Sequence, residues 1–184
     1  MLNDLEAKVG LGRYAIEMFN PEKYQSFFQL IDDNREQLAV FFVGIVSKTN
    51  TLEETKRFCE QVQLRMADRS YFPFVVIDTA TQKFIGLVDI KNIDWAIPKA
   101  EIGYCIDARY AGQGIMSEAV KVVTEFVARK YALKKVFCRV APENLASVNI
   151  AIKNGFELEG TLRREYKTLH GDIVDLNYYG RLFH

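Results

Sequence analysis

The sequence predicts one α+β domain built around a mixed β-sheet, and three observations support this. The chain has 184 residues, of which 49% are hydrophobic, and this is enough for one well-buried core but short for two. Two stretches, residues 71–93 and 156–183, each hold a pair of apolar segments joined by a polar turn, as antiparallel hairpins do. Segments with helical spacing of apolar residues precede the first hairpin and separate it from the second. We therefore expect a single domain over residues 1–184, with residues 1–10 as a flexible arm.

The first strand is expected at residues 13–19, and a helix follows it. Asn20 and Pro21 suit the N-cap and the first helical position, and apolar residues then recur at near-helical spacing as far as Leu38. The next segment, LAVFFVGIV at residues 38–46, is apolar enough for a strand but directly follows the helix. We interpret it as a loop or a helix extension that could line a substrate site.

A capping box begins the second helix, and three strands come after it. Thr51 and Glu54 have the spacing of a capping box, in which the side chain of each residue accepts a hydrogen bond from the backbone N–H of the other. The strands are expected at residues 71–78, 83–93 and 100–107. The turn TATQ joins the first two as a hairpin, and the third, AEIGYCID, leads straight into a glycine-containing turn.

This turn is followed at once by a helix. The stretch ARYAGQGIMSEAV, residues 108–120, places Gly112 and Gly114 just before an amphipathic helix over residues 115–130. Two glycines here cost backbone entropy, so we expect them to supply an unusual φ or a close approach to the backbone. A helix N-terminus offers unpaired N–H groups and a partial positive charge, which together suit a phosphate group.

The last part of the chain reads as a strand, a helix and a hairpin. The strand KVFCRVA is expected at residues 135–141. Asn144 suits the N-cap of a helix that runs to Asn154 and stops at Gly155, a favourable residue after a helix end. The remaining residues, 156–183, form a hairpin around the turn HGD.

Composition argues against several classes of function. The 24 basic residues offset 24 acidic ones, and nucleic-acid binders that neutralise phosphates usually carry a basic excess. We therefore expect no nucleic acid as the primary ligand. The sequence has no signal peptide and no run of about 18 apolar residues, which predicts a cytoplasmic protein without a membrane partner.

Cysteine and histidine are too few and too scattered for a metal site. Cys59, Cys105 and Cys138 lie far apart in apolar contexts, so buried free thiols are expected rather than ligands. His170 and His184 alone offer little material for a metal centre or a Ser-His-Asp triad. We expect no metal.

Two common nucleotide-binding patterns fit the glycine turn poorly. A P-loop needs Gly-Lys followed by Ser or Thr, whereas Ile115 and Met116 stand there. A Rossmann fingerprint needs a third glycine where Ser117 stands, and an acidic residue about 20 positions on, where residues 131–135 supply none.

A third pattern, Arg/Gln-x-x-Gly-x-Gly/Ala after a strand and before a helix, does fit. Here the chain resembles the GNAT superfamily of acetyl-CoA-dependent N-acetyltransferases. The stretch APENLASVNIAIKNGFELEG, residues 141–160, looks like the late motif of the ribosomal-protein N-acetyltransferase branch (RimJ/RimL-like), in which Asn-x-x-Ser opens a helix that ends in Lys-x-Gly-Phe-x-x-Glu-Gly. The order of elements agrees from about residue 13 to residue 183.

The resemblance implies a GNAT fold: a mostly antiparallel sheet of six to seven strands, splayed in the middle and flanked by about four helices. The pantetheine arm of coenzyme A would lie between the strands EIGYCID and KVFCRVA, with a backbone N–H near Cys105 or Ile106 facing the thioester oxygen. Arg109 could pair with a phosphate, or be exposed to solvent. The pyrophosphate would lie on the backbone N–H groups of the turn, supplied by Ala111, Gly112, Gln113, Gly114 and Ile115. The alternative is a turn that merely links a strand to a helix.

The resemblance also suggests catalytic residues. Glu101 matches the strand position of a catalytic glutamate, and would act as a general base or instead organise the site by pairing with a basic neighbour. Ser147 would donate a proton to the departing thiolate, and Asn144 would bond the pantetheine chain, cap the helix, or do both. Many GNAT enzymes carry a tyrosine acid further down this helix, but residues 149–153 contain none. The tyrosines that the chain does offer are more plausible as packing residues: Tyr104, Tyr110 and Tyr166.

The expected function is acetyl transfer from acetyl-CoA to a primary amine by direct attack in a ternary complex. Deprotonating a lysine amine at neutral pH costs roughly 4.6 kcal/mol, against about 1 kcal/mol for an α-amine, so an enzyme for protein N-termini or small amines needs a strong base less. A catalytically silent coenzyme A-binding regulatory module is the alternative. The acceptor is expected to contact residues 38–50 and the last hairpin. The cluster VFFVGIV could contact the acceptor or a second subunit of a homodimer, although core packing is the commoner explanation of such a cluster.

Overall fold

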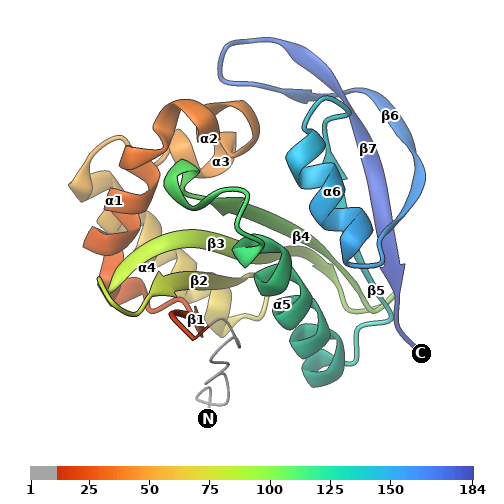
Figure 1. Cartoon of the computed structure of the whole chain (residues 1–184), viewed down its shortest axis with the longest axis horizontal. Coiled ribbons are helices and arrows are strands. Elements are labelled where there is room, and N and C mark those ends of the chain that lie inside the picture. Colours follow the sequence, from red (N-terminus) through yellow and green to blue (C-terminus); the bar gives the residue numbers. More distant parts are fainter. Residues whose placement is uncertain (1–11) are drawn as a thin grey trace.

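One seven-stranded sheet, in the order β1-β2-β3-β4-β5-β7-β6, forms the centre of the protein (Figure 1). It is seen in a computed structural model that describes residues 12–184; the expected arm at residues 1–10 lies outside them. Neighbouring strands are antiparallel except β4 and β5, which are parallel, so the expected mixed sheet is confirmed. The strands are β1 (Tyr14–Met18), β2 (Phe72–Asp78), β3 (Lys83–Asp94), β4 (Lys99–Ile106), β5 (Lys135–Val140), β6 (Glu157–Lys167) and β7 (Ile173–Leu182).

The parallel pair in the middle of the sheet opens into a gap. Strands β4 and β5 pair only over three residues each, and the last pair joins Glu101 to Phe137. Beyond it β4 continues to Ile106 and β5 to Val140 without pairing with each other. The splay expected between these two strands is therefore confirmed, and we call the space beyond Glu101 the β4–β5 gap.

Six α-helices flank the sheet in the part of the chain that the structure describes, where the sequence predicted about four. The difference arises at residues 24–46, which form three helices instead of one helix followed by a loop or an extension. Asn34 interrupts the first of the series, because its side chain bonds the Leu30 carbonyl (2.9 Å) and the Ala108 N–H (3.1 Å). The helices are α1 (Tyr24–Asp33), α2 (Arg35–Phe41), α3 (Val43–Val46), α4 (Leu52–Ala67), α5 (Ile115–Tyr131) and α6 (Leu145–Lys153), with 3-10 turns at Pro21–Lys23 and Ala108–Tyr110.

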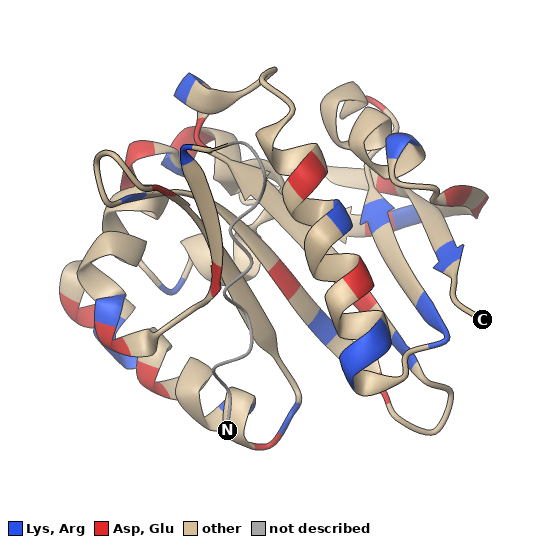
Figure 2. Ribbon diagram, turned by 60° about the horizontal axis from the view of Figure 1, so that its bottom comes forward, with Lys and Arg blue, Asp and Glu red and all other residues tan. Residues whose placement is uncertain are grey.

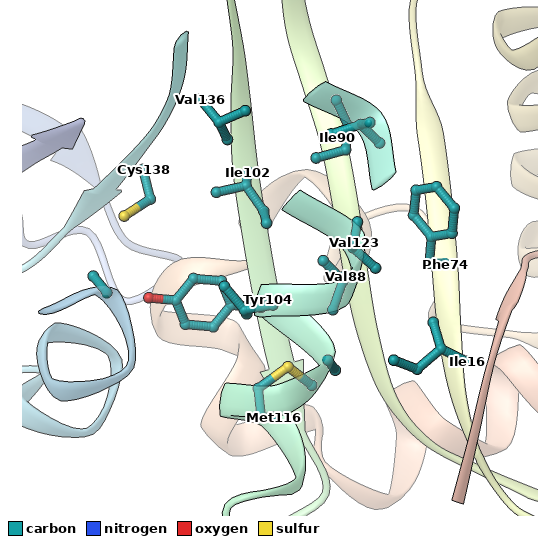
Figure 3. Close-up of a cluster of buried hydrophobic side chains, with 14 of the residues drawn as sticks. Ile16, Phe74, Val88, Ile90, Ile102, Tyr104, Met116, Val123, Val136 and Cys138 are labelled. Atoms are coloured by element: carbon teal, nitrogen blue, oxygen red, sulfur yellow. The ribbon is translucent and has the colours of Figure 1, made fainter. Parts of the chain in front are cut away.

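Each face of the sheet has its own hydrophobic core. On the face covered by α5 and α6, Ile102 and Tyr104 of β4 pack with Val123 of α5 (Figure 3). Cys105 points to the other face and packs with residues of α1 and α4. Side chains therefore alternate along β4, and Glu101 lies on the same face as Cys105. The alternation also assigns the side chains that border the β4–β5 gap to one face of the sheet or the other.

The turns and caps predicted from local sequence are confirmed. The Thr51 hydroxyl accepts the Glu54 N–H (3.2 Å), and Glu54 in turn accepts the Asn50 N–H (3.0 Å). Asn20 accepts the Glu22 N–H (3.0 Å) at the first 3-10 turn. Local signals of this kind succeed because donor and acceptor lie within one helical turn.

The placement of charged residues and cysteines in the structure agrees with what the composition predicted for them. Acidic and basic residues are interspersed along the helices and strands (Figure 2). The three cysteines are buried and free, as expected. Residues 12–184 contain no cluster of three or more His, Cys, Asp or Glu side chains that could hold a metal ion. Over the same residues, no helix has both the length and the apolar character that crossing a membrane requires.

Candidate active site

The glycine turn meets α5 with both glycines in the left-handed region. Gly112 has φ 76° and Gly114, the N-cap of α5, has φ 77°. A Cβ built on either residue would have no atom within 4 Å, so the turn needs glycine for its backbone conformation and not for lack of space. The surface over the turn is open.

Among the described residues, the backbone amides of this turn form a run without hydrogen-bond partners. The N–H groups of residues 112–117 donate no hydrogen bond to any atom of residues 12–184, and the first bond of the helix is that from the Glu118 N–H to the Gly114 carbonyl (3.1 Å). Ala111 was expected to offer its N–H to the pyrophosphate, but in the structure this N–H donates to the Ala108 carbonyl (3.2 Å). The available run therefore begins at Gly112 and extends past Ile115. It suits an anion, since a helix N-terminus adds a partial positive charge.

Arg109 is exposed to solvent, which is the second of its two expected roles: 60% of its side chain is accessible. Its guanidinium lies between two carboxylates, with Nη2 2.7 Å from Asp33 and Nε 2.9 Å from Asp107. Asp107 is almost fully buried, and the hydrogen bonds from Arg109 lower the pKa of its carboxyl. Arg109 thus ties the turn to α1. A phosphate would have to compete with both carboxylates for this guanidinium, and phosphate pairing by Arg109 stays a prediction.

A surface cavity of about 400 Å³ borders this ion pair, with walls that include Leu30 of α1 and Phe84 of β3. Neither Glu101 nor Ser147 lines it. The cavity is therefore separate from the β4–β5 gap.

Helix α6 begins at the far side of the gap. Asn144 caps it, with Oδ1 accepting the Ser147 N–H (3.2 Å), so the capping alternative holds and the Asn144 amide nitrogen is left for another partner. The Ser147 hydroxyl makes no hydrogen bond within residues 12–184. The Tyr104 hydroxyl donates to the Ser147 carbonyl (2.8 Å) and points from β4 toward α6, with Cys138 nearby (Figure 3). Burial raises the pKa of the Cys138 thiol to about 12.

Alternation of the backbone distinguishes Cys105 from Ile106. Asp107 donates its N–H to the Ile85 carbonyl of β3 (2.8 Å), and the register between these strands is unbroken over the preceding residues. The Cys105 N–H, two residues earlier, therefore also points to β3. The Ile106 N–H points the opposite way, into the gap. Of the two amides expected to face a thioester, the geometry leaves Ile106, and the Cys105 amide belongs to the sheet.

Glu101 stands at the point where the gap opens, paired with a basic neighbour. Arg139 donates to both of its oxygens, through Nε (3.2 Å) and Nη2 (3.0 Å), and Asn92 donates to Oε2 (2.7 Å). Only 5% of Glu101 is exposed. The organising role left open by the sequence is thus the one with contacts in the structure, while proton abstraction stays a prediction.

Sequence reasoning missed three residues at this point: Asn92, Arg139 and Glu165. Arg139 also donates to Glu165 of β6 (3.2 Å), which makes a chain of charges across three strands. The alternation of side chains in the strand KVFCRVA could have placed Arg139 on the face of the sheet opposite to that of Cys138. Its partner could not be read locally, because Glu101 and Glu165 come from distant segments.

The two segments expected to hold the acceptor meet each other. The Val43 N–H donates to the Tyr166 hydroxyl (3.2 Å), and the Leu169 N–H donates to the Ala39 carbonyl (3.3 Å). These contacts join the α2–α3 segment to the β6–β7 hairpin, as the top of Figure 1 shows. Tyr110 instead packs away from the gap, with its hydroxyl 3.1 Å from Asp78.

Comparison with known proteins identifies relatives over most of the chain. The family model described as an acetyltransferase (GNAT) domain matches residues 13–157. A probable N-acetyltransferase, YjcK of Bacillus subtilis, is 29% identical over 75% of this chain and 77% of its own length. A ribosomal-protein-serine acetyltransferase of Escherichia coli is 30% identical over 71% of this chain and 72% of its own.

A solved structure agrees in fold over nearly the full length. The microcin C7 self-immunity acetyltransferase MccE, in complex with acetyl-CoA and AMP, superposes with a TM-score of 0.85 at 22% identity, covering 99% of this chain and 98% of its own. At this identity the likeness establishes the arrangement of the strands and helices.

Proposed function

Because the chain belongs to the GNAT family of acetyltransferases, and is an N-acetyltransferase that uses acetyl-CoA, we propose how its own residues bind the two substrates and transfer the acetyl group. The acceptor is a primary amine, either a protein N-terminus or a small molecule. The alternative, a catalytically silent coenzyme A-binding module, is not favoured, since the relatives are named as N-acetyltransferases. One observation carries the proposal: the amides of residues 112–117, which have no hydrogen-bond partner within residues 12–184, follow the strand that borders the β4–β5 gap.

The diphosphate of coenzyme A lies on these amides. The residues present fit such a group, because the turn is exposed, both glycines hold positive φ, and the N-terminus of the 17-residue helix α5 favours negative charge. Arg109 contributes by fixing the turn through Asp33 and Asp107. Because α5 lies on one face of the sheet, the cofactor approaches the gap from that face.

The gap holds the pantetheine arm and the thioester. Tyr104 and Ile106 direct their backbone N–H groups into it, and the Ile106 amide is placed to stabilise the oxyanion. The Asn144 amide nitrogen bonds the arm from the other side, since its oxygen is used by the helix cap.

The acceptor approaches from the opposite face, where Glu101, Arg139 and the α2–α3 segment lie. Its neutral nitrogen attacks the thioester carbonyl carbon, a C–N bond forms, and the C–S bond breaks. Ser147 gives its hydroxyl proton to the departing thiolate, directly or through water, and the proton lost by the amine replaces it. Glu101 holds Arg139 and the end of the gap in place.

Thiol release tests this proposal. Purified protein is incubated with acetyl-CoA and a panel of peptides with free N-termini, amino-acid amides and alkylamines, and free thiol is measured against a reaction without acceptor. Acceptor-dependent thiol release with N-acetylated product is the expected result. Tight binding of acetyl-CoA without turnover on any acceptor would instead favour the silent module.

A further inference from the structure

A second charged side chain, Lys91, lies beside Glu101 on the face of the sheet from which the acceptor approaches, which we call the acceptor face. The two are direct partners in the antiparallel pairing of β3 with β4, and directly opposed residues share a face at a Cβ separation of about 5 Å. Lys91 is therefore one strand away from the point where the gap opens. It has no part in the roles proposed above.

A buried carboxylate holds the Lys91 ammonium against the backbone of β4. Its Nζ lies 3.2 Å from Asp89, which is 2% exposed and also accepts the Tyr71 hydroxyl (3.0 Å). Opposite them β4 carries Gly103, and a Cβ there would collide with the Asp89 carboxylate and lie 2.7 Å from Nζ. Glycine is thus required at this position to let the charged pair lie flat between Glu101 and Cys105.

The ammonium is charged and has donors to spare. Burial lowers the pKa of Lys91, but the Asp89 and Glu101 carboxylates more than offset this and raise it above the ordinary value. A lysine carries three donors, and within the described residues its hydrogen bonds all go to Asp89. The side chain is 29% exposed, and Nζ lies 5.8 Å from the ring of Phe42 at the α2–α3 junction. The Lys91 ammonium therefore lies between the sheet and the α2–α3 segment, on the face from which the acceptor approaches.

We infer that Lys91 is a specificity-determining residue that selects acceptors in which the carbon bearing the amine also bears a carbonyl group. This inference rests on the proposed function, because it concerns the acceptor of the same site. An amine that attacks the thioester from the acceptor face brings the substituents of its α-carbon toward Gly103 and the Lys91 ammonium. The carbonyl of a peptide N-terminus or an amino-acid derivative accepts a hydrogen bond there. An alkylamine or a lysine side chain has no such oxygen.

The test compares two matched acceptors. One is the amino-acid amide that the wild-type enzyme acetylates fastest; the other is the alkylamine in which its carboxamide is replaced by an ethyl group. We expect the wild-type kcat/KM to favour the amide by at least about tenfold, the size of one charge-assisted hydrogen bond. Lys91→Met should remove most of this preference by raising KM for the amide. KM for acetyl-CoA and kcat/KM for the alkylamine should change little.

Controls separate specificity from folding. Because Lys91→Met leaves Asp89 buried without its partner, the double variant Lys91→Met/Asp89→Asn is measured as well, and Lys91→Arg should restore part of the preference. Lys135→Met is the matched control, since Lys135 pairs with Glu159 elsewhere on the same face and should keep the full preference.

Each outcome has one meaning. Wild-type enzyme that acetylates amines without favouring the amide overturns this inference and leaves the proposed function standing. Enzyme that acetylates no amine overturns the proposed function itself. A preference that survives in both Lys91→Met and the double variant also overturns the inference.

Discussion

The Tyr104 hydroxyl donates a 2.8 Å hydrogen bond to the Ser147 carbonyl, across the region where β4 and β5 no longer pair. On the opposite face of the sheet, Arg139 bonds both oxygens of Glu101 at the start of the same gap. The hydrogen-bonded pairing of β4 with β5 ends at Glu101. Beyond this point, side-chain hydrogen bonds on both faces of the sheet fix the distance between β4 on one side of the site and β5 and α6 on the other. The Tyr104 bond thereby fixes Ser147 and the start of α6 relative to β4, the strand that carries the Ile106 amide.

Tyr104→Phe should loosen this connection while preserving the core. Removing one hydroxyl bond costs about 1 kcal/mol in the free energy of unfolding, and the packed ring remains. We expect a severalfold rise in KM for acetyl-CoA together with a lower kcat. Steady-state kinetics and urea unfolding measure the two effects. Tyr179→Phe is the control, because Tyr179 belongs to the same core and its hydroxyl has only a 3.5 Å contact with Asn177; equal kinetic effects in both variants would contradict the assignment.

Gly114→Ala should weaken acetyl-CoA binding. The residue holds φ 77°, where a Cβ costs roughly 1–2 kcal/mol, and relief of this strain would turn the amides of the turn away from the diphosphate. We expect at least about tenfold weaker binding by calorimetry. Gly160→Ala is the control, since Gly160 also has open space around it but no positive φ. Unchanged affinity in Gly114→Ala would remove the turn from the binding site.

Glu101→Gln should lower activity without changing the shape of the pH profile. The variant leaves the Arg139 guanidinium with Glu165 as its remaining carboxylate, so kcat/KM should fall about tenfold at every pH and stability by about 1–3 kcal/mol. Glu159→Gln, which breaks the Lys135 pair, provides the control. Loss of the acidic limb of the pH profile in Glu101→Gln alone would instead make Glu101 the general base.

Ser147→Ala should slow turnover and spare binding. A positioned general acid contributes about a hundredfold, and the helix cap survives because it uses the Ser147 backbone N–H. The measurement is kcat together with the dissociation constant of acetyl-CoA. Ser26→Ala, in the first turn of α1, should behave like the wild type. An unchanged kcat in Ser147→Ala would leave the proton for the thiolate to another donor.

Protonation of Asp107 should make the protein less stable in acid. Because Arg109 lowers the pKa of Asp107 in the folded state, this carboxylate adds stability above its unfolded pKa, near 3.9, and the contribution is lost as pH falls through the lower folded value. Asp107→Asn should therefore reduce stability at pH 7 and flatten the decline below about pH 4. Urea unfolding at pH 7, 5, 4 and 3 follows this. Asp172→Asn, at an exposed position in the last turn, should keep the wild-type slope.

Sequence alone identified the elements whose signals are local. The capping oxygens of Asn144 and Thr51, the two glycines before α5 and the hairpin turns all act within a few residues, so their hydrogen bonds and φ angles follow from the residues themselves. The position of the gap was also predicted, although through resemblance to a family rather than from spacing.

Only the tertiary structure decided which charges meet. Arg109 reaches Asp33 across 76 residues, and Arg139 reaches Glu101 across 38, so no local pattern could supply the carboxylate partner of either arginine. Lys91 and Gly103 become neighbours through strand register alone. The physical reason is that backbone conformation is governed mainly by adjacent atoms, whereas a buried charge takes whichever opposite charge the folded chain brings within a few ångströms.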